Sequence, residues 1–320
     1  MSHRTLGRTD LRVSPLCLGG NVFGWTADEA ASFAVLDAYV DGGGNFIDTA
    51  ESYSRWVPGH QGGESEAILG RWMRARKNRD QLVIATKVGA PMGEAPEQRG
   101  LSRRRIMEAV DGSLRRLQTD VIDLYQAHFD DSATPLEETL SAFDELVKAG
   151  KVRHLGASNY SAARLNEALD TARRLGLRPY EAMQPEYNLL DREQYEGELQ
   201  KTCQEHGLGV ITYYSLASGF LSGKYRKDQP LPASSRAAAV QREYMNPRGF
   251  RVLEALDQVA ARYEATVSQV ALAWVMAQPG VTSAIASATT VPQLQELLGA
   301  VPLQLDADAL ARLTEAGRPD

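Results

Sequence analysis

The sequence has little of what would mark a secreted, metal-binding or membrane-embedded protein. Two cysteines, Cys17 and Cys203, are too few for a disulfide framework or a zinc site, and their apolar surroundings predict buried, inert thiols. The longest apolar run, residues 270–277, falls far short of the roughly 20 residues that a membrane-spanning helix needs. The first ten residues are charged and lack an apolar core, so we expect no signal peptide and a cytoplasmic protein.

The sequence also lacks an excess of positive charge. Its 35 basic and 41 acidic residues give a formal net charge of −6, which provides no attraction to nucleic acid or to an anionic membrane. The basic clusters at 103–105 and 115–116 lie in helical patterns with acidic neighbours and are typical of solvated helix faces. We therefore expect a small-molecule partner rather than nucleic acid or a membrane. The sequence leaves open whether the chain forms a homo-oligomer.

Strand-like and helix-like segments alternate along nearly the whole chain. A hairpin is predicted over residues 4–14. Eight buried strands are predicted over residues 15–20, 45–48, 82–87, 121–128, 152–158, 181–184, 209–214 and 282–286. Apolar residues at helical spacing follow each of them, after capping patterns such as Thr26-x-x-Glu29 and Thr134-Pro135-Leu136-Glu137, with threonine at the N-cap. A polar loop is expected between the seventh strand and the helices that precede the eighth.

Eight strand–helix units without a linker predict one closed (β/α)8 barrel over residues 1–320, with the hairpin capping its bottom. A doubly wound open sheet is the competing architecture. A dinucleotide-binding sheet of that kind usually carries G-x-G-x-x-G after its first strand, and no such motif occurs here. The barrel is therefore the favoured prediction.

Polar side chains gather at the predicted carboxyl ends of these strands, where barrel enzymes keep their active sites. The residues at these ends are Asp48 and Tyr53, Lys87, His128, Ser158 and Asn159, Gln184, and Tyr213. Taken singly, each residue has an ordinary structural interpretation. Asp48 could cap a helix, Tyr53 could be a loop aromatic, and the Lys87 side chain could simply extend into solvent. Together, four titratable groups from three successive strand ends indicate a shared site.

The four titratable groups suit the protonation of a carbonyl oxygen. A free tyrosine has a pKa of about 10 and is a poor acid near neutrality. A nearby lysine such as Lys87 is expected to lower the pKa of Tyr53, while Asp48 holds the lysine in place. His128 can donate a hydrogen bond to the carbonyl oxygen and orient it. Such a site performs half of a carbonyl reduction, and the hydride must come from a cofactor.

Several segments resemble the signature blocks of the aldo-keto reductase superfamily. They are FIDTAESY (46–53), IATKVG (84–89), DLYQAHFDD (123–131), GKVRHLGASNYS (150–161), QPEYNLLDRE (184–193) and YYSLASGFLSGKYR (213–226). The likeness runs from about residue 4 to about residue 300, with the blocks in order. It implies a (β/α)8 barrel that binds NADP(H) or NAD(H) in an extended pose. It also implies that Tyr53 is the general acid, that Asp48 and Lys87 tune it, and that His128 orients the carbonyl.

The resemblance further implies which residues contact the cofactor. Ser158, Asn159 and Gln184 should hold the nicotinamide carboxamide, and Tyr213 should stack on its ring. The other implied contacts are Gly20, Asn21, Asp48, Tyr214, Ser215, Leu216, Ala217, Ser218, Gly219, Lys224, Arg236, Ser287, Thr289, Gln293 and Glu296. Of these, the resemblance implies that Lys224 should contact the pyrophosphate and that Arg236 should approach the adenosine phosphate.

One block departs from the family pattern. The family commonly has arginine, lysine or serine where this chain has Thr289. A guanidinium there would pair bidentately with a 2′-phosphate, whereas threonine offers only a hydroxyl. The resemblance favours NADP(H) as the cofactor, and Thr289 leaves NAD(H) or dual use open.

The substrate is expected to be a small carbonyl compound. Trp25, Trp56 and Phe129 offer aromatic walls beside Tyr53 and His128, suited to aldehydes, ketones or the apolar face of a sugar. Trp56 has the equally good reading of a loop anchor. We therefore predict a nicotinamide-dependent oxidoreductase without a metal.

Two other functions fit parts of the pattern. The first is a cofactor-binding regulatory subunit with little turnover, as in the ion-channel β-subunits that resemble this family. The second is a lyase in which Lys87 forms a Schiff base. The intact set of four titratable groups favours catalysis, and Asp48 would keep Lys87 charged, which disfavours the lyase.

Overall fold

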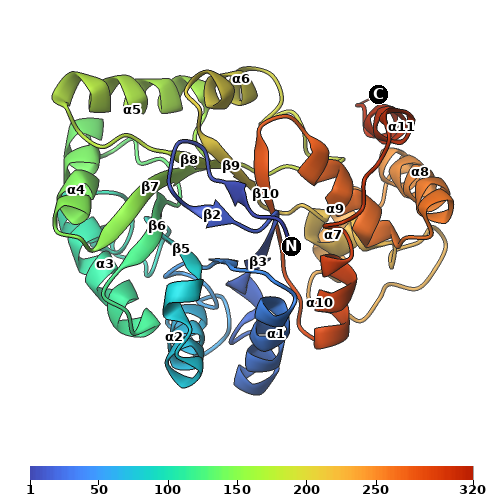
Figure 1. The fold of residues 1–320 in the computed structure, drawn as a ribbon, viewed down its shortest axis with the longest axis horizontal. Coiled ribbons are helices and arrows are strands. Elements are labelled where there is room, and N and C mark those ends of the chain that lie inside the picture. The colour runs from blue at the N-terminus through green and yellow to red at the C-terminus, as the bar shows by residue number, and fades with distance from the viewer. Residues whose placement is uncertain (320) are drawn as a thin grey trace.

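The computed structural model describes residues 1–319 and contains a closed barrel of parallel strands surrounded by helices (Figure 1). The barrel strands are β3 (Leu16–Gly19), β4 (Phe46–Asp48), β5 (Val83–Val88), β6 (Ile122–Ala127), β7 (Val152–Ser158), β8 (Ala182–Gln184), β9 (Gly209–Thr212) and β10 (Val281–Ala286). Neighbours in the barrel are consecutive in the chain, and β10 closes it against β3. The predicted barrel is confirmed, and its strand bounds differ from the predicted ones by at most two residues.

The helices outside the strands follow the predicted alternation. They are α1 (Glu29–Asp41), α2 (Glu64–Arg76), α3 (Arg103–Leu117), α4 (Leu136–Lys148), α5 (Ala162–Leu175), α6 (Glu198–Glu205), α7 (Ala237–Tyr244), α8 (Pro247–Tyr263), α9 (Val267–Ala277), α10 (Val291–Leu298) and α11 (Ala307–Ala316). Short 3-10 helices are η1 (Gly20–Val22), η2 (Arg79–Gln81), η3 (Pro96–Gln98) and η4 (Ala217–Ser222). No helix within residues 1–319 combines the length and apolar character needed to cross a membrane.

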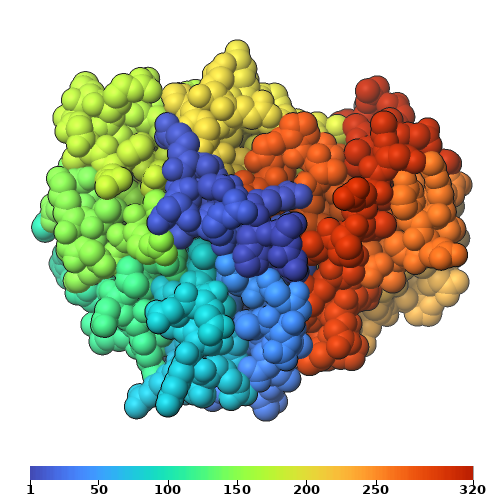
Figure 2. All heavy atoms as spheres, viewed as in Figure 1, coloured from blue at the N-terminus to red at the C-terminus, as the bar shows by residue number. Residues whose placement is uncertain are grey.

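An N-terminal hairpin of β1 (Arg4–Thr5) and β2 (Arg12–Val13) closes the amino end of the barrel, as predicted, and lies over its centre in Figures 1 and 2. Apolar hairpin side chains such as Leu6 and Leu11 are fully buried against residues that point into the barrel. Gly7 has a φ of +53°, and a Cβ there would lie 2.3 Å from the backbone nitrogen of Gly209. Only glycine fits this approach, which brings the hairpin turn onto the start of β9.

The hairpin is also held by charged groups. His154 on β7 contacts Asp10 of the hairpin at 2.6 Å through Nε2 and Glu181 at 2.8 Å through Nδ1. Arg153, its neighbour in the chain, forms an ion pair of 2.9 Å with the same Asp10. These contacts join the hairpin to the amino ends of the strands and leave their carboxyl ends open.

Local differences from the predicted elements have identifiable causes. The N-cap of α1 is Asp28, whose side chain accepts from Ala31 N, so the prediction of Thr26 was wrong. The prediction of Thr134 as the N-cap of α4 was also wrong, because its hydroxyl donates to Asp131 Oδ2 at 2.7 Å and Pro135 takes the cap position. The loop after β9 was predicted without regular structure, yet it holds η4 and α7. The two cysteines are free and buried, as predicted.

Candidate active site

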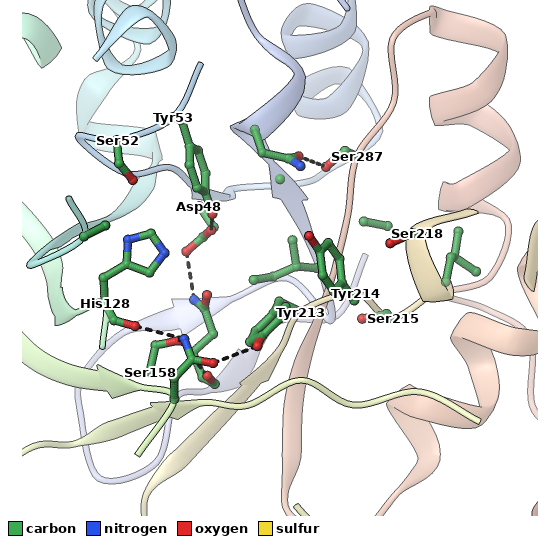
Figure 3. A pocket seen from close by; sticks show the side chains of 18 of the residues that line it. Asp48, Ser52, Tyr53, His128, Ser158, Tyr213, Tyr214, Ser215, Ser218 and Ser287 are labelled. Carbon is green, nitrogen blue, oxygen red and sulfur yellow. Dashed lines mark hydrogen bonds between the residues drawn. The ribbon is translucent and has the colours of Figure 1, made fainter. Parts of the chain in front are cut away.

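A cavity of about 430 Å³ opens at the carboxyl ends of the strands (Figure 3). We call it the main cavity, and its lining consists of Gly19, Asn21, Asp48, Ser52, Tyr53, Trp56, Ala90, His128, Phe129, Ser158, Asn159, Gln184, Tyr213, Tyr214, Ser215, Leu216, Ser218, Gly219, Arg236, Ile285, Ala286 and Ser287. Polar residues that were predicted from strand ends far apart in the sequence therefore line one cavity.

Asp48, Tyr53 and Lys87 form a compact hydrogen-bonded group beneath this cavity. Lys87 Nζ donates to Asp48 Oδ2 at 2.6 Å, to Tyr53 Oη at 2.8 Å and to the carbonyl oxygen of Thr49 at 2.9 Å. An ammonium has three N–H donors, so these three acceptors satisfy it completely. Lys87 and Asp48 are each only 1% exposed. A lysine so enclosed and paired is a poor nucleophile, which argues against the Schiff-base reading.

Asp48 is held from its other side by two amides. Its Oδ1 accepts from Gln184 Nε2 at 2.9 Å and from Gln126 Nε2 at 3.4 Å. Gln126 was not predicted as part of the site. The signal was available in the sequence, because Gln126 is a polar residue at an inward position of the apolar strand β6, two residues after the buried Leu124.

The Tyr53 hydroxyl remains protonated in this arrangement. Burial raises the pKa of Tyr53 well above its usual range, and the charge and hydrogen bond of Asp48 raise it further. The prediction that the nearby Lys87 lowers this pKa was therefore wrong, because burial and the carboxylate outweigh the ammonium. A protonated phenol is the form in which tyrosine can act as a general acid.

His128 lies at the cavity wall as a neutral imidazole. Burial lowers the pKa of His128 well below its usual range, and the positive charge of Lys87 lowers it further. Its Nδ1 is buried and has no hydrogen-bond partner within residues 1–319. A proton on Nδ1 would be an unsatisfied buried donor, so we assign the proton to Nε2. Nε2–H can then donate a hydrogen bond to a molecule bound in the cavity. The ring stacks on Phe129 at a centroid distance of 4.8 Å.

The predicted nicotinamide residues form a hydrogen-bonded floor next to this group. Tyr213 Oη donates to Asn159 Oδ1 at 2.7 Å, and Asn159 Nδ2 donates to the His128 carbonyl oxygen at 2.9 Å. Ser158 Oγ donates to the Gln184 carbonyl oxygen at 2.8 Å. Figure 3 shows Ser158, Tyr213 and His128 of this network at the cavity. The loops after β6, β7 and β9 are thus fixed to one another before any ligand binds.

A second cavity of about 520 Å³ continues from the main cavity. The two share Leu216, Ser218, Gly219, Arg236 and Ser287, and the second cavity also reaches Trp25, Lys224, Thr289, Gln293 and Glu296. Together they form one elongated groove, as an extended dinucleotide would require. Thr289 donates to Gln293 Oε1 at 2.9 Å, and its hydroxyl is engaged inside the chain.

The residues present fit a nicotinamide dinucleotide. Ser218 and Gly219 line both cavities, whereas the N–H groups of Ala217 and Gly219 already donate to the carbonyl oxygens of Tyr214 and Leu216. Lys224 and Arg236 line the same region. Burial lowers the pKa of Lys224, and the like charge of Arg236 lowers it further. Two cations in the lining of one cavity are suited to a pyrophosphate or phosphate group.

Two residues that the resemblance implied as cofactor contacts lie elsewhere. In the described structure, Gly20 and Ala217 are buried and line neither cavity. Lining residues that the sequence analysis did not identify include Gly19, Ser52, Ala90, Ser222, Ser234, Ser235 and Ser268. They are small residues on loops or at the ends of β3, η4 and α9, and no pattern in the sequence marks such positions.

Aromatic side chains surround the mouth of the main cavity. Trp56 and Phe129 remain 49% and 45% exposed, although both line the cavity. Trp25 packs edge-on against Trp56 at 5.4 Å, and the Arg236 guanidinium lies 5.6 Å from the centroid of the Trp25 ring. Trp25 lines the second cavity rather than the main one. No group of His, Cys, Asp and Glu side chains in residues 1–319 is arranged to hold a metal ion.

Comparison with known proteins agrees with this geometry. Residues 15–318 match the model of the Aldo/keto reductase family. The uncharacterized oxidoreductase YrpG of Bacillus subtilis (strain 168) is 36% identical over 98% of this chain and 95% of its own length. A probable voltage-gated potassium channel subunit beta of Oryza sativa subsp. japonica is 37% identical, over 94% of this chain and 91% of its own. The corresponding subunit of Arabidopsis thaliana is 36% identical over the same shares. A barrel with a tyrosine–lysine–aspartate group below its mouth, a family match along almost the whole chain and relatives of this coverage together show that the protein belongs to the aldo/keto reductase family.

Proposed function

We propose that the protein reduces an aldehyde or ketone to an alcohol, with NADP(H) as the preferred cofactor. The observation that carries this proposal is the 2.8 Å hydrogen bond from Lys87 to the protonated hydroxyl of Tyr53, beside the neutral His128 at the wall of the main cavity. A bound reduced nicotinamide supplies a hydride to the carbonyl carbon. The residues of this chain then have to position the carbonyl oxygen and deliver a proton to it.

Tyr53 and His128 can do so from adjacent positions. Their ring centroids lie 6.1 Å apart, and both side chains line the main cavity. His128 Nε2–H donates a hydrogen bond that orients the carbonyl oxygen, and Tyr53 transfers its proton to that oxygen as negative charge develops. Lys87 then donates to the phenolate that remains. Asp48, held by Gln184, keeps Lys87 in place through the cycle.

The position of Arg236 supports NADP(H) as the preferred cofactor. Arg236 lines both cavities, and its guanidinium lies over the Trp25 ring, so a positive charge lies where the two cavities meet. It can pair with a phosphate group in place of the cation that Thr289 does not supply. Lys224, which lines the second cavity, is then free to meet the pyrophosphate. Gln293 and Glu296 lie where an adenine would end.

The lining favours a neutral, largely apolar carbonyl compound. Among the described residues that line the main cavity, Ser52, Trp56, Ala90 and Phe129 carry no charge, and the one cation, Arg236, is the residue proposed for the cofactor phosphate. A carboxylate or phosphate on the substrate would find no counter-ion there. Flat aldehydes and ketones can instead pack against the exposed aromatic faces.

Loss of the reduced-nicotinamide absorbance, followed with a panel of neutral and charged carbonyl compounds, tests the proposal. The wild type should turn over neutral aldehydes with NADPH, and Tyr53→Phe should lower kcat by ~100-fold or more, because general acid catalysis contributes roughly 10²–10⁴-fold. Tyr160→Phe is the control, since it removes a buried hydroxyl whose partner is Tyr180. Equal turnover by Tyr53→Phe and wild type would rule out the phenol as the acid.

A cofactor-binding regulatory subunit with little turnover is a second candidate. The named potassium channel β-subunits among the relatives support it. The complete group of Asp48, Tyr53, Lys87 and His128 favours an enzyme. Tight NADPH binding without measurable consumption of any carbonyl compound would favour the regulatory role.

A further inference from the structure

Glu51 stands out as a buried charge in the loop that carries the proposed acid. It lies between Asp48 and Tyr53 and is only 2% exposed. Its neighbour Ser52 lines the main cavity, whereas Glu51 is not among the described lining residues. An ionised carboxylate is expensive to bury without a partner, so its contacts identify what it does.

The partner of Glu51 is Arg105 on α3. Arg105 Nη2 donates to Glu51 Oε1 at 2.5 Å, and Arg105 is itself only 7% exposed. Gly89 N, just beyond the end of β5, approaches the same oxygen at 3.4 Å. The backbone N–H of Glu51 also donates to the Lys87 carbonyl oxygen at 3.4 Å. The middle of the loop is thereby tied to α3 and to the strand end that bears Lys87.

The far end of the same loop has its own anchor. Ser54 Oγ donates to the Phe23 carbonyl oxygen at 2.8 Å, so the chain is fixed on both sides of Tyr53. The Tyr53 hydroxyl has a short contact to Lys87 and a longer one, 3.3 Å, to Asp48. The loop anchors therefore fix the backbone on both sides of Tyr53, while the bond to Lys87 holds the hydroxyl itself.

We infer that Glu51 and Arg105 are positioning residues, whose buried ion pair holds loop 49–52 so that the Tyr53 hydroxyl stays within reach of Lys87. The inference rests on the proposed role of Tyr53 as the general acid. It assigns an effect on the proton-transfer step to two residues outside the cavity lining. A displacement of about 1 Å at a reacting group can cost on the order of 100-fold in rate. Even a partial loosening of the ion pair should therefore lower kcat.

A second buried ion pair provides a matched control. Glu66 on α2 is fully buried and pairs with Arg116, also on α3, at 2.7 Å. Its Oε1 accepts from Thr86 Oγ1 on β5 at 2.6 Å. This pair has the same charges and joins the same helix α3, but its hydrogen bonds reach α2 and the outside of β5, not the loop of Tyr53. Burial raises the pKa of Glu51 and the nearby charge of Glu66 raises it further, so loss of the Glu66 charge favours the ionised, paired form of Glu51. Loss of either pair should destabilise the protein, whereas only loss of the first should disturb Tyr53.

The test compares Glu51→Gln with Glu66→Gln by hydrogen–deuterium exchange of residues 48–56 and by steady-state kinetics with NADPH and an aldehyde. Glu51→Gln should speed exchange in this segment by ~10-fold or more and lower kcat by ~10–100-fold, with KM for the aldehyde changed by less than about threefold. Glu66→Gln should leave kcat within about twofold of wild type, since its pair does not touch the loop. Arg105→Lys keeps the charge but loses the planar guanidinium, so its kcat should lie between those of wild type and Glu51→Gln. This variant takes the place of Glu51→Gln if Glu51→Gln does not fold.

Combination with Tyr53→Phe separates this inference from the proposed function. If Glu51 acts through Tyr53, Glu51→Gln should lower the residual kcat of Tyr53→Phe by less than about twofold. Wild-type exchange and kcat in Glu51→Gln, or equal losses of kcat in Glu51→Gln and Glu66→Gln, would overturn the positioning role. Full turnover by Tyr53→Phe would instead overturn the proposed acid, and the exchange rates would still decide whether Glu51 fixes the loop.

Discussion

Replacing Lys87 by methionine removes one partner of the most enclosed ion pair in the site. Lys87 and Asp48 are each 1% exposed, and the Nζ–Oδ2 distance is 2.6 Å. Breaking a buried pair from one side leaves an uncompensated charge, which typically costs about 3–5 kcal/mol. Since a domain is typically stable by about 5–15 kcal/mol, Lys87→Met should lose a large part of the free energy of unfolding.

A second substitution should restore the stability that Lys87→Met loses. Asp48→Asn in the Lys87→Met background removes the remaining charge and keeps an oxygen to accept from Gln184. The double variant should therefore recover most of the lost stability, to within about 2 kcal/mol of wild type. Rescue of folding should not rescue catalysis, because Tyr53 has still lost its donor.

Urea unfolding at neutral pH, read from the midpoint at unchanged m-value, measures these differences. A loss below about 1 kcal/mol in Lys87→Met would mean that solvent reaches Asp48 and that the pair is not enclosed. A double variant no more stable than Lys87→Met would show that lost packing, and not the unpaired charge, causes the damage.

Three further predictions concern the cofactor and the hairpin. Arg236→Leu should weaken NADPH binding by ~10–100-fold and NADH binding far less, because a charge-assisted hydrogen bond contributes about 1.5–3 kcal/mol. Fluorescence titration measures both affinities, and equal losses for the two cofactors would mean that Arg236 does not contact the 2′-phosphate. Thr289→Arg should shift preference toward NADPH in the same titration, and an unchanged ratio would mean that residue 289 does not reach the phosphate. Burial would lower the pKa of His154, but its hydrogen bonds to Glu181 and Asp10 outweigh burial and raise it. Its stabilising effect is thus complete below pH about 6.5, the ordinary value for histidine, and is lost as the pH rises through the raised value. His154→Gln should accordingly lower Tm more at about pH 6 than at about pH 9, and a deficit independent of pH would contradict this.

The barrel could be predicted because its strands and its helices each leave a local pattern in the sequence. Each β-strand is a short apolar run between turn residues, and in each helix apolar residues recur at helical spacing. The grouping of Asp48, Lys87 and His128 followed once the strands were placed in a barrel, because parallel strands put their carboxyl ends at one rim. Gln126 could have been found in the same way from its inward position on β6.

Other features depend on tertiary contacts that a linear pattern does not contain. The direction of the pKa shift of Tyr53 depends on how deeply the phenol is buried and how close Asp48 lies. Thr134 fails to cap α4 because Asp131 takes its hydroxyl, a choice that the capping pattern cannot express. The pairing of Glu51 with Arg105 joins residues 54 positions apart, and neither lies in a pattern that signals the other.

Transfer of deuterium from NADPH labelled at C4 of the nicotinamide tests whether the protein reduces a carbonyl compound. The product should be an alcohol that carries the deuterium on its carbinol carbon, while its hydroxyl proton comes through Tyr53 and exchanges with solvent. Mass spectrometry of the product locates the label. An alcohol formed without deuterium from either C4 position, or no alcohol from any carbonyl compound despite bound NADPH, would contradict it.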